Sequence, residues 1–195
     1  MRREDFKMVS GISIKAKKMF DKYIESNEDI YNLNCHIEEL ERLAEKIVQK
    51  FPDLDKEILL LAVYFHDIGY YPLNPNEDHA VTGERIARKF LEKEKYSNEK
   101  MEKALHAIRA HRCKDILPDT LEARAFAFMD SASHMTSKVY FEMVKDGKGK
   151  KALEKLERDY RDLAIFPEIK KEMEPLYLSW KSLITSLTKF EESKL

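Results

Sequence analysis

The sequence predicts an all-α protein, and three observations support that prediction. Apolar residues recur three and four positions apart in nearly every segment, which is typical of one face of an α-helix, and no segment alternates as a half-buried strand does. Only five glycines and six prolines interrupt the 195 residues, which favours long helices over many turns. Hydrophobic residues make up 43% of the chain, enough for the core of one ordinary domain. We therefore expect one helical bundle of about seven to eight helices.

Turn and capping residues separate the expected helices in order along the chain. The segment "FPDLDKE" ends the second helix, and Asp53 or Asp55 can cap the third. The segment "GYYPLNPNED" ends the third helix and starts the fourth. The Gly/Lys segment "KDGKGKK" joins two helices of one domain, because the roughly 45 residues that follow it make a poor independent unit. The expected helices span residues 10–25, 33–51, 56–68, 78–95, 98–113, 119–145, 149–164 and 168–190.

Composition also limits the classes of function. Charged residues make up 36% of the chain but cancel to a net charge of −1, so no overall basic field favours nucleic acid as a partner. The longest uncharged apolar run, residues 58–65, is too short to cross a bilayer, and the first ten residues contain no secretory signal. Cys35 and Cys113 lie far apart without a CxxC motif, which is consistent with reduced thiols. We expect a soluble, cytoplasmic protein with no membrane partner.

Helical geometry sorts the six histidines, because residues three, four and seven positions apart share one face of a helix. His106 lies nearly opposite Ile108 and is expected to face solvent. Asp130 falls on the apolar stripe of helix 119–145, and Asp67 directly follows the apolar run of the third helix. Four histidines continue the apolar stripes of four different helices and are expected to face inward: His36, His66, His79 and His111.

Six inward polar side chains together predict a metal site. Any one of these histidines, taken alone, is more often a hydrogen-bonded core residue than a metal ligand. Two buried carboxylates and four buried imidazoles would, however, leave a large desolvation cost that one or two divalent cations would offset. A mixed imidazole and carboxylate set without thiolate suits Mn, Fe, Co, Ni or Zn. Six ligands are too many for one catalytic ion and suit two ions that share a carboxylate.

The order of these residues resembles the HD-domain metalloprotein superfamily, whose minimal signature is H…HD…D. The signature here consists of His36, His66–Asp67 and Asp130, with spacings of 30 and 63 residues, and the resemblance covers about residues 30–135. The segments "DHAVTGERIARKFL" and "AIRAH" are similar to those that supply two further histidines in the two-metal variant. The resemblance implies one metal at the signature residues and a second at Asp67, His79 and His111. Bacterial HD-domain dinucleoside-tetraphosphate hydrolases share this order of six ligands.

The sequence also departs from several HD subfamilies. Many HD phosphohydrolases follow HD with "IGK", and Tyr70 stands here in place of that lysine. The segment "HDIGYY" lacks the acidic pair typical of (p)ppGpp hydrolases, and the chain lacks the HH pair with a later GYP of cyclic-di-GMP phosphodiesterases. Arg112 and Lys114, just past His111, are the candidate phosphate-binding residues.

The resemblance implies a metal-dependent phosphohydrolase that acts on a nucleotide or another small phosphate ester or anhydride, with Asp67 as the catalytic residue that orients a metal-activated water. Two other classes remain open: a mixed-valence di-iron oxygenase, which uses the same ligands, and a non-catalytic HD module that binds a metal or ligand. His134, one turn after Asp130, is a packing residue, a partner of that ligand or an acid in the pocket. We expect residues 1–195 to form one HD-type domain, on which the helices of about 149–190 pack or through which two copies pair as a homo-oligomer.

Overall fold

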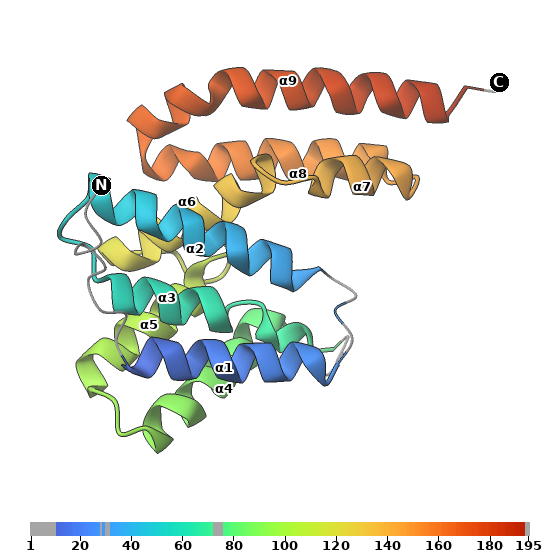
Figure 1. Cartoon of the computed structure of the whole chain (residues 1–195). Coiled ribbons are helices and arrows are strands. Elements are labelled where there is room, and N and C mark those ends of the chain that lie inside the picture. The colour runs from blue at the N-terminus through green and yellow to red at the C-terminus, as the bar shows by residue number, and fades with distance from the viewer. Residues whose placement is uncertain (1–10, 28, 30–31, 72–75, 194–195) are drawn as a thin grey trace, which may run out of the picture. The chain divides into compact units, whose positions relative to one another are not determined.

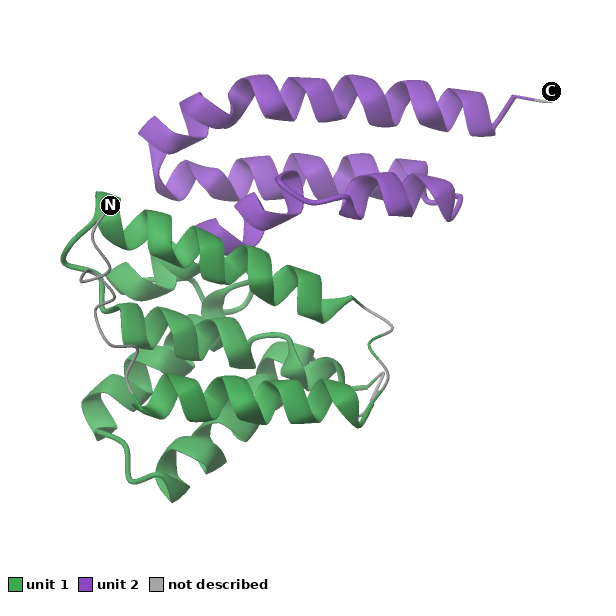
Figure 2. Cartoon of the chain, in the orientation of Figure 1, with its two compact units in different colours: residues 1–127 green, residues 128–195 purple. Residues whose placement is uncertain are grey.

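The computed structural model of the chain describes residues 11–27, 29, 32–71 and 76–193 (Figure 1). Within these residues it contains nine α-helices, two short 3-10 helices and no strand, so the all-α prediction is confirmed. The chain divides into two compact units, residues 1–127 and residues 128–195 (Figure 2). The single domain expected for residues 1–195 stays a prediction. The expected first residue of the first helix, residue 10, and residues 72–75 of the expected loop lie outside the described residues.

The first unit is built around its most apolar helix, α3. This helix contacts α1, α2, α4 and α5, so every one of its faces meets another helix. That position explains the unbroken apolar run, because all eight side chains of residues 58–65 are buried. Asp55 caps α3, since its Oδ1 accepts hydrogen bonds from the backbone N–H groups of Glu57 at 3.0 Å and Ile58 at 3.4 Å. The elements of this unit are α1 (Gly11–Glu25), α2 (Leu33–Lys50), α3 (Lys56–Phe65), η1 (Ile68–Tyr70), α4 (His79–Lys93), α5 (Asn98–Ala110) and the first part of α6 (Leu121–Met135).

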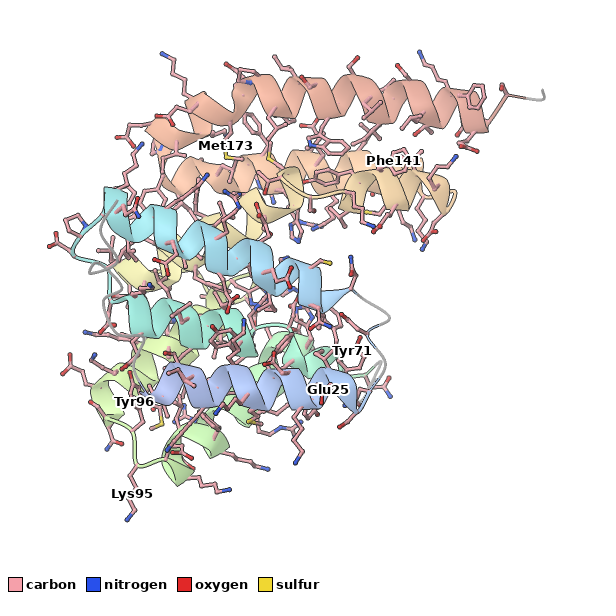
Figure 3. All side chains as sticks on the ribbon, viewed as in Figure 1. Glu25, Tyr71, Lys95, Tyr96, Phe141 and Met173 are labelled. Atoms are coloured by element: carbon pink, nitrogen blue, oxygen red, sulfur yellow. The ribbon has the colours of Figure 1, made fainter. Side chains whose placement is uncertain are left out.

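The chain leaves α3 in a tight turn that two glycines make room for. A Cβ on Gly69 would lie 2.1 Å from the carbonyl oxygen of His79, and a Cβ on Gly83 would lie 2.4 Å from that of Phe65. Both distances are far shorter than any real contact of a Cβ atom, so only glycine fits at these positions. The Tyr23 hydroxyl then donates to the backbone oxygen of Tyr71 at 2.7 Å, which ties the end of the turn to α1. Figure 3 labels Tyr71 and, on α1, Glu25. These contacts bring the start of α4 directly against the end of α3.

Two of the expected helices end three residues earlier than the sequence indicated. The expected helix 56–68 ends at Phe65, and the expected helix 98–113 ends at Ala110. Asp67 has φ −106° and ψ −1°, outside regular helical geometry, and a 3-10 turn follows it. Cys113 adopts a left-handed conformation with φ 49°, which no α-helix accommodates. In both cases a histidine directly follows the last helical residue: His66 follows Phe65, and His111 follows Ala110.

The second unit contains the rest of α6 and three further helices. The single helix expected over 119–145 is wrong, because the chain leaves helical geometry after Met135 and starts α7 at Val139. The Thr136 hydroxyl donates to the backbone oxygen of Ala132 at 3.4 Å, and the Ser137 hydroxyl donates to that of His134 at 3.2 Å. Such local bonds compete with the helical ladder and favour a break. The remaining elements are α7 (Val139–Lys145), α8 (Gly149–Asp162), η2 (Leu163–Ile165) and α9 (Pro167–Glu191).

Helices α7, α8 and α9 contact one another and bury a small core of their own. Trp180, on α9, donates its indole N–H to the backbone oxygen of Met135 at 2.8 Å, and its ring meets that of Tyr140 edge-on at 5.4 Å. Trp180 is therefore a packing residue of this unit. None of the described helices is both long enough and apolar enough to cross a membrane.

Candidate metal centre

Five of the six predicted ligands lie in the first unit, and four of these five stand at the end of a helix. His36 lies in the first turn of α2. Residues at the end of a helix are outside the regular hydrogen-bond pattern of its interior, so their side chains can turn toward a common point. His66 ends α3, Asp67 follows it, His79 is the first residue of α4, and His111 ends α5.

Two of the imidazoles are held by the backbone of their own helices. The Nδ1 of His66 lies 3.0 Å from the carbonyl oxygen of Val63, and the Nδ1 of His111 lies 2.6 Å from that of Ile108. A carbonyl oxygen only accepts, so Nδ1 carries the proton and the Nε2 of a neutral ring presents its lone pair. His66 is fully buried and His111 is 4% exposed. This is the way in which proteins commonly orient metal-binding histidines.

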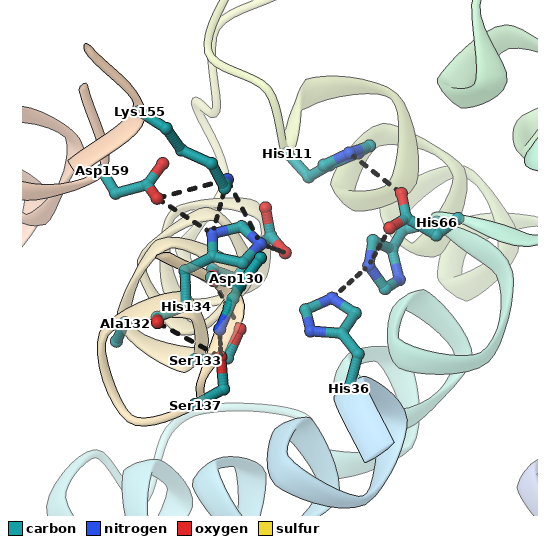
Figure 4. Close-up of polar contacts among 12 residues, drawn as sticks. His36, His66, His111, Asp130, Ala132, Ser133, His134, Ser137, Lys155 and Asp159 are labelled. Atoms are coloured by element: carbon teal, nitrogen blue, oxygen red, sulfur yellow. Dashed lines mark hydrogen bonds and ion pairs between the residues drawn. The ribbon is translucent and has the colours of Figure 1, made fainter. Parts of the chain in front are cut away.

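The two oxygens of Asp67 face different imidazoles. Its Oδ2 lies 3.5 Å from Nε2 of His66, whereas its Oδ1 lies 3.2 Å from Nε2 of His79 and 3.7 Å from Nε2 of His111. The Nε2 atoms themselves form two pairs: those of His36 and His66 lie 3.1 Å apart (Figure 4), and those of His79 and His111 lie 3.3 Å apart. The carboxylate thus lies between two pairs of imidazole nitrogens.

Each pair, together with Asp67, has the donors that a divalent cation requires. In the group of His36, His66 and Asp67 one ligand atom from each residue lies within 4.8 Å of the others, and the same holds for the group of Asp67, His79 and His111. Two ligands each about 2.1 Å from one ion lie about 3–4 Å apart, so these spacings suit coordination of a single ion by each group. The imidazole and carboxylate donors suit a transition metal. The residues present therefore fit two cations that share Asp67.

The charge state of Asp67 also fits a ligand. Burial by itself raises the pKa of this carboxyl group, but the neighbouring imidazoles of His66, His79 and His111 lower it and outweigh burial. The net result is a pKa well below the ordinary value of 3.8, so Asp67 is ionised at neutral pH.

The residues just outside this cluster show two features that the sequence analysis missed. The ring of Tyr70 stacks on that of His79, with the centroids 4.1 Å apart and the planes 15° apart. Tyr70 therefore packs on an imidazole where many HD phosphohydrolases have a lysine. Asp78 caps α4, since its Oδ1 accepts from the N–H of Ala80 at 2.9 Å, and its Oδ2 forms an ion pair with Arg112. The acidic residue at the first position of the expected helix 78–95 could have indicated the cap, but not its ion pair.

The structure places the two candidate phosphate-binding residues at the end of α5. Arg112 is half-buried and engaged by Asp78, and Lys114 is exposed on the following loop. A phosphate-binding role for either residue stays a prediction. His106, expected to face solvent, is half-exposed, and its Nε2 accepts a hydrogen bond from the N–H of Asp119 at 3.2 Å.

The sixth predicted ligand, Asp130, lies on the part of α6 that belongs to the second unit. Its Oδ1 is 3.9 Å from Nε2 of His134, one turn further along the same helix. The Ser133 hydroxyl donates to the backbone oxygen of Asp130 at 2.6 Å. Within the second unit, Asp130 therefore has His134 as a neighbour, which is one of the roles that the sequence left open for this histidine.

The helical fold and the paired imidazoles around Asp67 define an all-α protein with a candidate metal centre. The model of the HD domain family matches residues 34–135, just over half of the chain, and the chain belongs to this family. HD domains are of the metal-dependent hydrolase type and bind divalent metals. Neither a curated protein nor a solved structure matches the chain. The matched region ends where α6 ends and contains all six predicted ligands.

Proposed function

We propose that the protein is a metal-dependent phosphohydrolase that acts on a nucleotide or another small phosphate ester or anhydride. The observation that supports this most directly is the placement of one ionised carboxylate, Asp67, between two pairs of imidazole nitrogens. Membership of the HD domain family supports the same class of chemistry. The resemblance to bacterial HD-domain dinucleoside-tetraphosphate hydrolases rests on the shared order of six ligands and makes dinucleoside polyphosphates the first substrates to assay.

In this proposal the two groups hold one ion each. His36, His66 and Asp67 would hold the first ion, and Asp67, His79 and His111 would hold the second. The family signature adds Asp130 to the ligands of the first ion. When bound, two divalent ions (Mn, Fe, Co, Ni or Zn) activate water near neutral pH and polarise phosphoryl oxygens.

The protein's own residues then act mainly by holding donors in place. Because Nδ1 of His66 and Nδ1 of His111 are bonded to helix carbonyls, these rings present Nε2 without reorganisation when a ligand arrives. The stack of Tyr70 on His79 fixes the plane of a third ring. Asp67 orients the attacking water through its shared position. Arg112 and Lys114 are the candidate groups to bind the phosphate, and Arg112 must leave Asp78 to do so.

The test begins with the metal content of untagged protein purified without chelators and measured by elemental analysis. We expect close to two equivalents of a transition metal per chain in the wild type and a large loss in Asp67→Ala. Asp53→Ala is the matched control, because Asp53 is an exposed carboxylate in the turn before α3 and should leave metal content unchanged. A fully metallated, active Asp67→Ala variant would refute the centre as described.

Activity separates the three classes of function that share these ligands. Release of phosphate or a nucleotide product with Mn or Co under argon would support hydrolysis. Turnover that requires both iron and oxygen would replace the proposal with an oxygenase. One equivalent of metal would mean that His79 and His111 serve the substrate, and no uptake on reconstitution would leave a binding module.

A further inference from the structure

A second cluster of polar side chains lies in the second unit, around a buried carboxylate on α8. Asp159 is 3% exposed. Three groups converge on its Oδ2: the Tyr140 hydroxyl donates to it at 2.8 Å, Lys155 Nζ lies 3.2 Å away, and His134 Nδ1 lies 3.2 Å away. Figure 4 shows the contacts among His134, Lys155 and Asp159. With the exception of His134, these residues lie beyond residue 135, where the family match ends.

The cluster keeps Asp159 charged in spite of its burial. Burial raises the pKa of this carboxyl group, but the hydrogen bond and charge of His134, the charge of Lys155 and the Tyr140 hydroxyl together lower it below the ordinary value. A buried charged set of this kind is a poor way to gain stability, because apolar residues of similar volume commonly stabilise a protein at least as well. A role other than stability is therefore worth seeking.

The cluster contacts the His134 ring, and this ring in turn lies beside Asp130. Lys155 Nζ lies 3.0 Å from Nδ1 of His134, and Asp159 Oδ2 lies 3.2 Å from the same nitrogen. Whether Nδ1 donates to Asp159 or accepts from Lys155, its partner is a side chain of α8. The Nε2 of the same ring lies 3.4 Å from Lys155 Nζ and 3.9 Å from Oδ1 of Asp130. The orientation of His134, and with it the surroundings of Asp130, thus depends on α8.

We propose that Asp159 is a positioning residue of the metal centre, which acts through His134 to orient the carboxylate of Asp130, with Lys155 as the second group that holds the ring. The inference rests on the proposed function, in which Asp130 is a metal ligand. Partners that orient metal-ligating side chains commonly change metal affinity or activity about 10- to 100-fold when they are removed. Here such a partner would come from the helices that follow the HD match.

The test measures the apparent affinity of the full-length protein for Mn²⁺ by competition with a chelating dye. We expect Asp159→Asn to weaken binding about tenfold. Tyr140→Phe is the matched control, because it removes a hydrogen bond to the same oxygen but leaves the contact between Asp159 and His134. Tyr140→Phe should lower the melting temperature, because it loses a buried hydrogen bond as Asp159→Asn does. It should nevertheless leave Mn²⁺ affinity within about twofold of wild type.

A double-mutant cycle tests whether Asp159 acts through His134. We expect His134→Ala combined with Asp159→Asn to bind Mn²⁺ no more weakly than His134→Ala alone. Effects that multiply would show that the two residues act independently and would overturn the inference, as would an Asp159→Asn variant that melts earlier but binds Mn²⁺ like wild type. Should Asp159→Asn not fold, Lys155→Gln replaces it. Lys155 is partly exposed, and its loss should weaken binding several-fold; unchanged affinity would refute the role of α8.

The same assay distinguishes a failure of the proposed function from a failure of the positioning role. If wild-type protein binds no Mn²⁺ or other transition metal, the metal centre itself is refuted, and the positioning role is refuted with it. If the wild type binds metal and Asp159→Asn binds it equally well, only the positioning role is lost.

Discussion

Gly83→Ala should destabilise the protein, although the same change in an ordinary helix stabilises it. Replacing glycine by alanine inside a helix contributes about 1 kcal/mol of stability from helix propensity. At Gly83, however, the new Cβ would lie 2.4 Å from the carbonyl oxygen of Phe65 and 3.0 Å from that of His66. Ordinary contact begins at 3.4 Å, so α4 would have to move about 1.0 Å (3.4 − 2.4) away from the end of α3. Both opposing atoms belong to the backbone and cannot rotate aside.

The size of the effect follows from this overlap. Forced overpacking of a core typically costs about 1–3 kcal/mol. After the gain of about 1 kcal/mol from helix propensity, we expect the free energy of unfolding to fall by about 1 kcal/mol, which lowers the melting temperature by about 2–4 °C in a chain of this size. The same movement would draw Nε2 of His79 away from Oδ1 of Asp67, which now lies 3.2 Å from it. The second equivalent of metal should therefore bind more weakly.

Urea unfolding followed by circular dichroism measures the change in stability, and elemental analysis measures the metal. Gly11→Ala is the control, because nothing lies within 4 Å of a Cβ at that position. It should leave both quantities unchanged or raise stability slightly. A Gly83→Ala protein that is as stable as wild type and carries two equivalents of metal would refute the reasoning about this close approach.

Two further predictions follow from single contacts. His106→Ala should keep the full metal content and lose at most about 1 kcal/mol of stability with its bond from Asp119, whereas His111→Ala should lose metal; equal metal loss in the two variants would place His106 in the centre. Because the folded pKa of Asp159 lies below 3.8, the unfolded chain binds the extra proton first, so stability from this carboxylate is full above its unfolded pKa and is lost as pH falls through the folded one. The midpoint of urea unfolding, measured from neutral to acid pH, should therefore fall less steeply in Asp159→Asn than in wild type, and parallel curves would contradict this.

Much of the fold could be predicted because apolar periodicity is a local property of the sequence. The apolar run of residues 58–65 lies in the expected helix 56–68, and the structure places it in α3 with all eight side chains buried. The break between α6 and α7 was missed, because the apolar pattern continues across it while the hydroxyls of Thr136 and Ser137 bond to the preceding turn. Competition between side chain and backbone leaves no trace in periodicity.

The candidate site could be predicted in part for the same reason. Helix phase turned His36, His66, His79 and His111 inward, and the structure brings all four to Asp67. The stack of Tyr70 on His79 and the ion pair of Asp78 with Arg112 depend on how separate helices meet, which a sequence pattern does not encode. Asp159 did leave a signal that was overlooked. It lies three residues after Leu156 and four before Leu163, both buried, so it interrupts an apolar stripe as Asp130 does.

The position of Trp180 makes the two units optically distinct. It is the protein's only tryptophan, and Met135 and Tyr140, which it contacts, belong to the second unit as it does. Selective excitation of the indole therefore reports the melting of residues 128–195, whereas far-ultraviolet circular dichroism reports every helix. Coincident transitions would mean that the chain melts as one cooperative domain, and separate transitions would mean that residues 1–127 and residues 128–195 melt independently.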